Sequence, residues 1–210
     1  MILIGQYDSP FVRRVAVALR LYGTAYEHRP WSVFGDADQI AAFNPLRRVP
    51  TLLLDDGTAL VESAAILDWL DELAGPERAL IPRSGPGRRD ALKICALASG
   101  MADKAVSLVY ERVIHDRGTP VWVERCRMQI AGVLDALEPW RAAGGGWWFG
   151  ERIGHADIAA GCVLRFVQEA LPGVFEEARW PALAAHGRAC EALPEFAAVV
   201  QPFKVTPPTP

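Results

Sequence analysis

The chain has 210 residues, and its 22 lysine and arginine residues against 25 aspartate and glutamate residues give a formal net charge of −3. The lack of a basic excess argues against a nucleic-acid or anionic-membrane partner. Half of the residues are hydrophobic (51%), which is enough for one large or two small folded domains and excludes wholesale disorder.

The start of the chain, MILIGQYDSP, lacks the basic region and the long apolar run of a signal peptide. No uncharged apolar stretch approaches the roughly 18 residues that span a bilayer. The four cysteines lie far apart in helix-like segments, as expected of free thiols in a reducing compartment. The four histidines are also scattered, so no metal site is predicted. We therefore expect a cytoplasmic protein with no membrane partner.

The first 76 residues alternate between strand-like and helix-like patterns. Ser9-Pro10 is typical of a helix start, with serine at the N-cap and proline in the first turn, and Asp56-Gly57 indicates a tight hairpin. In chain order the pattern predicts strand 2–6, a helix from Ser9-Pro10 to Gly23, strand 25–29, helix 36–43, strands 50–54 and 58–61, and a helix from Glu62 to Gly75. This order predicts a compact α/β domain over residues 1–76.

Residues 77–87 are rich in proline and glycine and are predicted to form a linker. Beyond them the pattern is helical only, which predicts an all-α domain over residues 88–202. Its expected helices are 88–115, Thr119-Pro120 to about Trp140, 155–170, 181–192 and 194–201. The helix at 155–170 is almost entirely apolar and is predicted to be central and buried, and the tail from Lys204 is predicted to be extended.

Four short motifs occur in a fixed order along the chain. Residues 7–15 read YDSPFVRRV, residues 44–52 read NPLRRVPTL, residues 61–66 read VESAAI and residues 150–159 read GERIGHADIA. They are similar to the active-site segment, the N-P-x-G-[KQ]-V-P-x-L motif, the E-S-x-A-I segment and the G-x-x-x-[ST]-x-A-D-I-A motif of the cytosolic glutathione S-transferases. The chain resembles a bacterial Ser-type member of that family over almost its whole length. The resemblance implies an α/β thioredoxin-like N-terminal domain that binds glutathione, followed by an all-α C-terminal domain.

Ser9 is the candidate catalytic residue, because the serine at this place in the resembling enzymes points at the glutathione sulfur. A free thiol has a pKa of about 8.5, and lowering it by ~2 units takes roughly 2.7 kcal/mol. A hydrogen bond to a charged group supplies roughly 1.5–3 kcal/mol, and a helix N-terminus adds about 0.3–2 kcal/mol. The alternative is that Ser9 only caps the helix, and Tyr7 is the rival hydroxyl donor. A serine cannot form a mixed disulfide, so thiol-transfer chemistry is disfavoured.

The resemblance also implies the residues that bind glutathione. Val49-Pro50 is expected to be a cis peptide next to the cysteine of glutathione, although trans is the commoner state of a proline bond. Glu62 and Ser63 are expected to hold the amine and carboxylate of the γ-glutamyl group, with a simple helix cap as the alternative for Ser63. Arg48 is expected near the glycyl carboxylate, with a solvated surface charge as the alternative.

Two positions depart from the family's motifs. Arg47 stands where the family has glycine, which leaves open the backbone turn there and which of the two arginines reaches the ligand. Gly154 stands where the family has a serine or threonine N-cap, so only the carboxylate of Asp157 remains to cap the buried helix.

The predicted function is attack of the glutathione thiolate on a small apolar electrophile, with glutathione as co-substrate, no other cofactor and a homodimeric protein. Tyr7, Phe11, Phe34 and Tyr110 are candidates for the electrophile pocket, although aromatic residues with such spacing often belong to the core. A glutathione-dependent peroxidase or isomerase and a non-catalytic carrier or interaction protein are the alternatives. The identity of the electrophile, and the use of glutathione or a related thiol, stay open at this point.

Overall fold

The computed structural model describes residues 1–114 and 119–204. These residues form two compact units, one made of Met1–Leu80 with residues 195–204 and the other of Ile81–Pro194. The elements are β1 Ile2–Ile4, α1 Pro10–Leu21, β2 Glu27–Arg29, α2 Ala37–Ala41, β3 Thr51–Leu53, β4 Ala59–Val61, α3 Ser63–Ala74, α4 Gly85–Ile114, α5 Pro120–Ala142, α6 His155–Ala170, α7 Pro181–Glu191 and α8 Pro194–Ala197. An α/β unit followed by a helical unit confirms the predicted fold class.

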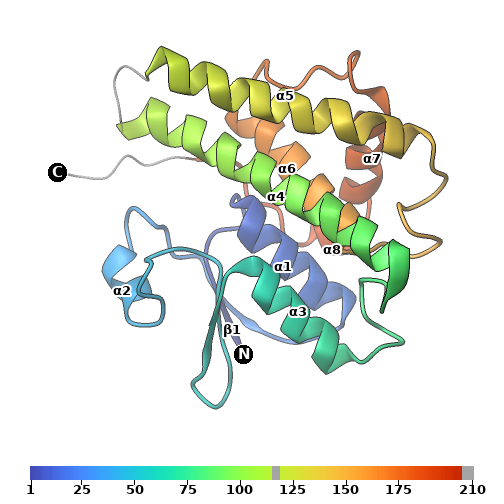
Figure 1. The fold of residues 1–210 in the computed structure, drawn as a ribbon. Helices are drawn as coiled ribbons and strands as arrows, with labels where there is room; N and C mark the ends of the chain where they lie inside the picture. Colours follow the sequence, from blue (N-terminus) through green and yellow to red (C-terminus); the bar gives the residue numbers. More distant parts are fainter. Residues whose placement is uncertain (115–118, 205–210) are drawn as a thin grey trace. The chain divides into compact units, whose positions relative to one another are not determined.

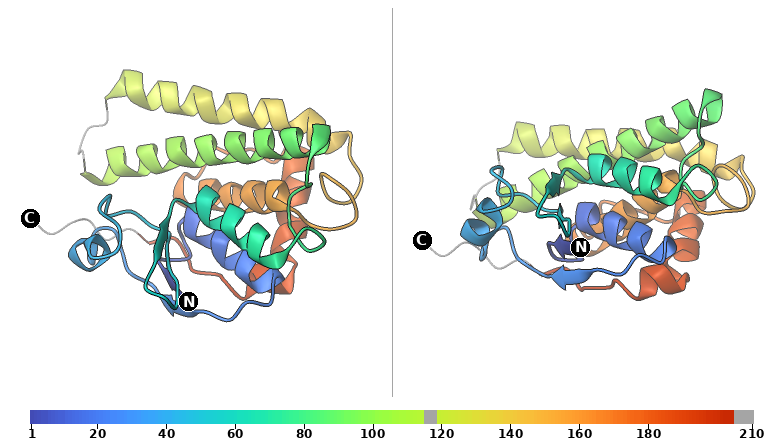
Figure 2. Two further views of the ribbon diagram at one scale, coloured as in Figure 1. Left: turned by 60° about the horizontal axis from the view of Figure 1, so that its bottom comes forward. Right: turned by 90° about the horizontal axis from the view of Figure 1, so that it is seen from below.

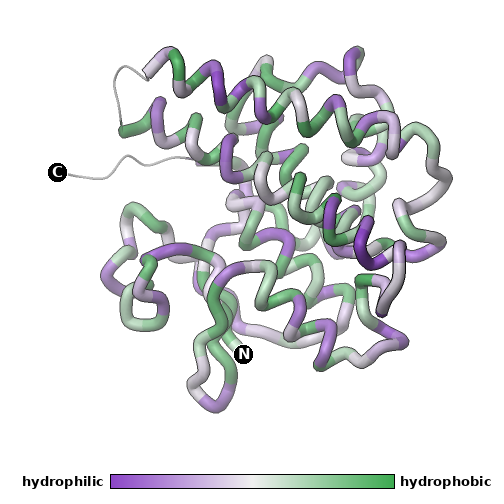
Figure 3. The backbone as a smooth tube through the Cα atoms, in the orientation of Figure 1, coloured by the Kyte–Doolittle hydropathy of each residue, from purple (hydrophilic) through white to green (hydrophobic). Residues whose placement is uncertain are grey.

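The first unit is built on a four-stranded mixed sheet with the strand order β2-β1-β3-β4. Strand β1 pairs parallel with β2 and antiparallel with β3, and β3 pairs antiparallel with β4. The Asp56-Gly57 hairpin joins β3 to β4, as predicted, and Figure 3 shows its polar tip projecting beyond the apolar strands.

Helices α1 and α3 pack together on one face of this sheet, and α2 lies on the opposite side (Figures 1 and 2). Helix α1 begins where the sequence predicts, with Ser9 at the N-cap and Pro10 in its first turn. All of its residues from Val12 to Leu19 are buried.

The second unit is a bundle in which α6 packs against α4 and α7, and α5 packs against the same two helices. Of the 16 residues of α6, 13 are buried, which confirms the predicted central helix. The carboxylate of Asp157, at the third position of α6, accepts the N–H of Gly154 at 2.9 Å. Gly154 has no side chain to return a bond, so Asp157 alone caps this helix end.

Helix α8 is shorter than the predicted helix 194–201, because it ends at Ala197. The segment around this end is held by a tertiary contact, since the carbonyls of Phe196 and Val199 accept hydrogen bonds from Arg13 of α1, and the Phe196 carbonyl also accepts the N–H of Val199 at 3.2 Å. Residues 195–202, which the sequence assigned to the second domain, accordingly pack with the first unit. The last three residues of the predicted linker 77–87 are helical, because α4 begins at Gly85. The predicted helix end at His115 and residues 205–210 of the predicted extended tail lie outside the described residues.

Candidate functional site

The register of the sheet brings three of the sequence motifs to one edge. Ile4, the last residue of β1, pairs with Thr51, the first residue of β3, and Thr51 pairs with Val61, the last residue of β4. The chain therefore leaves β1, enters β3 and leaves β4 at the same edge. The β1–α1 loop with Ser9, the Val49-Pro50 pair and the Glu62-Ser63 pair all follow directly from these positions.

Gly5 marks how closely two of these segments approach each other. It has a φ of +129°, and a Cβ atom placed on it would lie 2.5 Å from Val12 Cγ2 and 2.7 Å from Val49 Cβ. Only glycine fits between these two side chains in that backbone conformation. The start of α1 and the loop before β3 are therefore packed against each other across Gly5.

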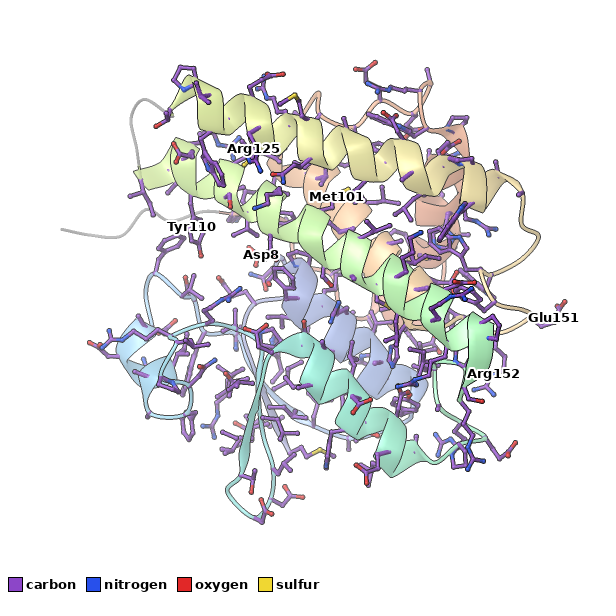
Figure 4. All side chains as sticks on the ribbon, in the orientation of Figure 1. Asp8, Met101, Tyr110, Arg125, Glu151 and Arg152 are labelled. Atoms are coloured by element: carbon purple, nitrogen blue, oxygen red, sulfur yellow. The ribbon has the colours of Figure 1, made fainter. Side chains whose placement is uncertain are left out.

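Ser9 lies at the N-cap of α1 with extended backbone dihedral angles, as predicted. Its Oγ accepts the N–H of Val12 at 3.4 Å, which is a long capping contact. A hydroxyl that accepts a bond still carries its own proton to donate. Ser9 thus places a hydroxyl that can donate a hydrogen bond at the N-terminus of α1, where the helix dipole is positive. Figure 4 labels its neighbour Asp8, in the turn that leads into the helix.

The loop between α2 and β3 is held by the buried side chain of Asn44. Its amide donates to the Arg48 carbonyl at 2.9 Å and to Thr51 Oγ1 at 3.2 Å, and its Oδ1 accepts the N–H of Leu46 at 3.0 Å. Arg47 keeps the left-handed backbone conformation, with a φ of 51°, that glycine adopts most easily. The loop therefore makes its turn without the glycine that the family's motif has there.

The two arginines of this loop point to different partners. Arg47 Nη1 lies 2.8 Å from Asp38 Oδ1 of α2, whereas Arg48 Nη1 lies 3.4 Å from Glu62 Oε1. Both side chains of the Arg48–Glu62 pair are about half exposed (55% and 53%), so a ligand can reach them. Arg48 thus lies beside Glu62 and Arg47 lies beside α2, and contact of Arg48 with the ligand stays a prediction.

The Val49-Pro50 peptide bond is cis, as predicted. Strand β4 ends at Val61 and α3 begins at Ser63, so Glu62 forms the junction that the motif predicts. Glu62 has a φ of 66°, a left-handed conformation that costs a non-glycine residue roughly 1–2 kcal/mol. Strain of this kind concentrates at functional sites. Ser63 is 3% exposed and opens the first turn of α3.

The side chain of Tyr7 is fixed by two contacts. Its hydroxyl shares a hydrogen bond of 2.8 Å with the hydroxyl of Tyr26, and its ring stacks on His28 at 3.8 Å between centroids. Burial and the Tyr26 hydrogen bond raise the pKa of Tyr7 above its ordinary value, and burial lowers the pKa of His28. The Tyr7 hydroxyl is already engaged with the Tyr26 hydroxyl, so it is less available than the Ser9 hydroxyl as a donor to a ligand.

The candidate pocket residues belong to different parts of the molecule. Phe11 is the second residue of α1 and Phe34 precedes α2, and both are partly exposed in the first unit. Tyr110 belongs to α4 of the second unit and is 38% exposed (Figure 4). A pocket wall that combines Tyr110 with Tyr7, Phe11 and Phe34 stays a prediction.

Within residues 1–114 and 119–204, no group of three or more histidine, cysteine, aspartate or glutamate side chains could hold a metal ion. In the same part of the chain, no helix has both the length and the apolar character needed to cross a membrane.

Sequence reasoning missed three residues that shape this edge. The sequence places Asn44 only at the start of the second motif, Gly5 in strand 2–6 and Gln201 in helix 194–201. Gln201 Oε1 nevertheless accepts the N–H of Tyr7 at 3.0 Å. A glycine directly after a buried strand was the one available signal, since it is typical of close backbone approach. The roles of Asn44 and Gln201 depend on contacts that no local pattern reveals.

Comparison with known proteins identifies the family that both units resemble. Residues 3–78 match the glutathione S-transferase N-terminal domain, and residues 120–188 match the glutathione S-transferase C-terminal domain. Among solved structures, the chain is similar to a glutathione S-transferase from Methylobacterium radiotolerans in complex with glutathione sulfonate. That likeness has a TM-score of 0.89 and 32% sequence identity, and it covers 98% of this chain and 96% of the other.

Two curated relatives show the range of the similarity. Glutathione S-transferase U6 of Arabidopsis thaliana is 27% identical over 168 residues, which are 80% of this chain and 71% of the relative. Maleylacetoacetate isomerase of Pseudomonas aeruginosa is 30% identical over 169 residues, which are 75% of this chain and 77% of the relative. With both domain matches, the shared fold and the motifs at one sheet edge, this chain belongs to the glutathione S-transferase family.

Proposed function

We propose that this protein is an enzyme that binds glutathione at the edge of its sheet and transfers the thiolate to a small apolar electrophile. The observation that carries the proposal is the convergence of three motifs on one edge. Ser9 with the N-terminus of α1, the Val49-Pro50 loop and the Glu62-Ser63 junction all follow strand ends that pair with one another.

Ser9 is the proposed catalytic residue of the Ser-type site. Its hydroxyl would donate a hydrogen bond to the glutathione sulfur, and the α1 N-terminus would add its positive potential. Together these interactions favour the thiolate by roughly 2–5 kcal/mol, which is enough to bring the thiol pKa from about 8.5 to near or below neutral pH. The thiol proton leaves to solvent, and the sulfur then forms a bond to the electrophilic carbon. With an aryl halide the carbon–halogen bond breaks and the halide leaves with the electron pair, and with an activated double bond the π electron pair moves to the neighbouring carbon, which takes a proton from solvent.

The other groups at the edge would bind the two ends of glutathione. We assign the γ-glutamyl amine to the carboxylate of Glu62 and its carboxylate to Ser63 and the N-terminal N–H groups of α3. We assign the glycyl carboxylate to Arg48, whose guanidinium can bind a carboxylate through two parallel hydrogen bonds. The backbone of Val49 would pair with the cysteine of glutathione in the manner of an added strand.

Glutathione supplies the nucleophile in this proposal, so no further cofactor is invoked. Phe11 and Phe34, with Tyr7, are our candidates in the first unit for the apolar wall that receives the electrophile. The homodimer, the cytoplasmic location and a role in detoxification stay predictions.

The test is an ultraviolet difference titration of glutathione into the protein at neutral pH, which detects thiolate absorption, together with turnover of an activated aryl halide. We expect a saturable thiolate signal in the wild type. Ser9→Ala should lose most of that signal and roughly 10- to 100-fold in turnover, while glutathione affinity by calorimetry stays within a few-fold.

Ser107→Ala is a matched control, because Ser107 lies in α4 and its hydroxyl donates only to the carbonyl of Asp103 in the same helix. It should leave both the thiolate signal and turnover unchanged. Unchanged turnover in Ser9→Ala would remove Ser9 from the mechanism. No thiolate signal in the wild type at millimolar glutathione would instead favour a carrier or interaction protein.

A second candidate is glutathione-dependent isomerisation, favoured by the similarity to a maleylacetoacetate isomerase. The same thiolate would add to a conjugated double bond, permit rotation about the resulting single bond and leave again. A cis-configured unsaturated diacid as substrate separates the two activities, because isomerisation consumes no glutathione whereas transfer consumes one molecule for each product.

A further inference from the structure

The C-terminal segment, residues 196–201, makes hydrogen bonds on both sides of Ser9 within the first unit. One set of bonds reaches Arg13 in the first turns of α1, and the other reaches Tyr7 in the loop before α1. Tyr7 and Gln201 are 194 positions apart in the sequence, so only the tertiary fold joins them. The segment thus contacts the chain just before and just after the proposed catalytic serine.

Arg13 forms the connection on the helix side. Its backbone N–H donates to the carbonyl of Ser9 at 2.9 Å, so it lies one helical turn beyond the N-cap. Its guanidinium is buried, donates to the carbonyls of Val199 at 3.0 Å and Phe196 at 3.1 Å, and lies over the Phe196 ring. A guanidinium stays charged when it is buried, so these charge-assisted bonds fix the segment against α1.

Gln201 forms the connection on the loop side. Its Oε1 accepts the N–H of Tyr7 at 3.0 Å. The same loop is closed by a bond of 3.2 Å from the N–H of Ser9 to the carbonyl of Gln6. The ring of Tyr7 is stacked on His28, so the residue two positions before Ser9 is held through both its backbone and its side chain.

We propose that the C-terminal segment positions the Ser9 hydroxyl for the glutathione sulfur, with Gln201 and Arg13 as positioning residues. This inference rests on the proposed function of Ser9. A loop of a few residues leads from β1 into α1, and its own bonds leave the Tyr7 amide to be satisfied from outside. Gln201 satisfies it and so sets the orientation of the turn that carries Ser9.

The proposal predicts where the effect of a change will appear. Gln201 bonds to the loop before α1, whereas the groups assigned to the two ends of glutathione, Arg48 and Glu62, lie beside each other. Loss of its hydrogen bond should therefore alter the alignment of Ser9 Oγ with the sulfur more than the affinity for the tripeptide. Small misplacements matter, because donors stabilise a developing or full charge only from closely defined positions.

The experiment uses the full chain, with glutathione itself as the probe. The pKa of bound glutathione is measured by ultraviolet titration across pH, and affinity is measured by calorimetry. Gln201→Met keeps the length of the side chain and removes its oxygen, and Gln201→Asn keeps the amide one methylene short of Tyr7. Val200→Ala is the matched control, because its side chain is next to Gln201 and is 43% exposed.

Both Gln201 variants should raise the pKa of the bound thiol by about 0.5 to 1, which is a roughly three- to tenfold loss of thiolate stabilisation. Their glutathione affinity should stay within about threefold at pH values below that pKa, and Val200→Ala should match the wild type. An unchanged thiol pKa in both variants, with a wild type that ionises glutathione, overturns this inference alone. A wild type that binds glutathione without ionising it overturns this inference and the proposed role of Ser9 together.

Discussion

Two pairs of ionisable side chains in this protein have contrasting environments. In the first unit, Arg48 and Glu62 lie 3.4 Å apart at the sheet edge, and each side chain is about half exposed. In the second unit, His186 Nε2 lies 3.8 Å from Asp157 Oδ1, and both side chains are 1% exposed. The first pair is available to a ligand, whereas the second is closed to solvent.

The buried pair belongs to a network of backbone and side-chain bonds. Asp157 accepts the N–H groups of Trp148 at 3.0 Å and Gly154 at 2.9 Å. Cys190 Sγ lies 3.6 Å from His186 Nε2, and the ring of Trp148 lies 4.8 Å from the His186 ring. Burial raises the pKa of Asp157, and burial followed by the charge of Arg141 lowers the pKa of His186 to about 4.

The contrast separates ionisable groups that stabilise the fold from groups that are available to bind a ligand. A buried carboxylate that accepts backbone hydrogen bonds stabilises the fold and is inaccessible to a ligand. An exposed ion pair contributes little to stability, and each of its side chains can bind a ligand instead of the other. Substitutions in the second unit should therefore change unfolding, and substitutions at the sheet edge should change binding.

The largest expected change in the free energy of unfolding comes from substitution of Asp157. Asp157→Ala leaves the N–H groups of Trp148 and Gly154 without their acceptor and should lower the free energy of unfolding by about 4 kcal/mol. Urea unfolding measures this change. Asp38→Ala is the matched control, because the Asp38 side chain is 92% exposed, and it should change stability by no more than about 1 kcal/mol. Equal effects of the two substitutions would contradict the contrast.

Acidification is expected to lower the free energy of unfolding by a nearly equal amount. Because the folded-state pKa of His186 is lowered to about 4, the unfolded chain takes up a proton below about 6.5 that the folded chain does not. The stability from neutral His186 is thus complete above pH 6.5 and is lost as pH falls towards 4, by about 3 kcal/mol in all.

The measurement is urea unfolding of the wild type and His186→Phe between pH 7 and pH 4. Effects of the carboxylates that do not contact position 186 are shared by both proteins, so the difference between them reports His186 with its neighbour Asp157. The groups that face it are Asp157, Cys190 and the charge of Arg141. We expect a smaller loss of stability on acidification in the variant, and parallel curves would show that His186 is not the titrating group.

The smallest effect on stability is expected at the sheet edge, where binding should change instead. Arg48→Gln and Glu62→Gln should each alter the free energy of unfolding by less than about 1 kcal/mol. Each should weaken glutathione binding by roughly tenfold, or about 1.4 kcal/mol, through loss of one charged partner of the ligand.

Arg47→Gln is the control for this prediction, because Arg47 is the neighbouring arginine and is paired with Asp38. It should leave glutathione affinity unchanged in calorimetry. Loss of affinity in Arg47→Gln with none in Arg48→Gln would exchange the roles of the two arginines. The double variant Arg48→Gln, Glu62→Gln measures whether the two sites bind the ligand independently.

Local signals were sufficient for much of the fold. Ser9-Pro10 predicted the exact start of α1, Asp56-Gly57 predicted the β3–β4 hairpin, and the apolar run at 155–170 predicted both the limits and the burial of α6. These features depend on helix caps, turns and hydrophobic periodicity. Each of these involves only a few neighbouring residues, so it can be recognised in the amino-acid sequence. The motifs also placed Ser9, Val49-Pro50 and Glu62-Ser63 in the candidate site.

The sequence by itself determined the order of the elements, the two kinds of unit, and the residues that carry the proposed chemistry. Only the tertiary structure decided that Arg48 and not Arg47 lies beside Glu62, and that Arg47 makes its turn in a left-handed conformation without glycine. It alone ended α8 at Ala197 and brought Gln201 to Tyr7. The physical reason is distance along the chain: helix caps and hairpins are satisfied by neighbours, whereas a buried guanidinium or an unpaired amide takes its partner from wherever the folded chain supplies one.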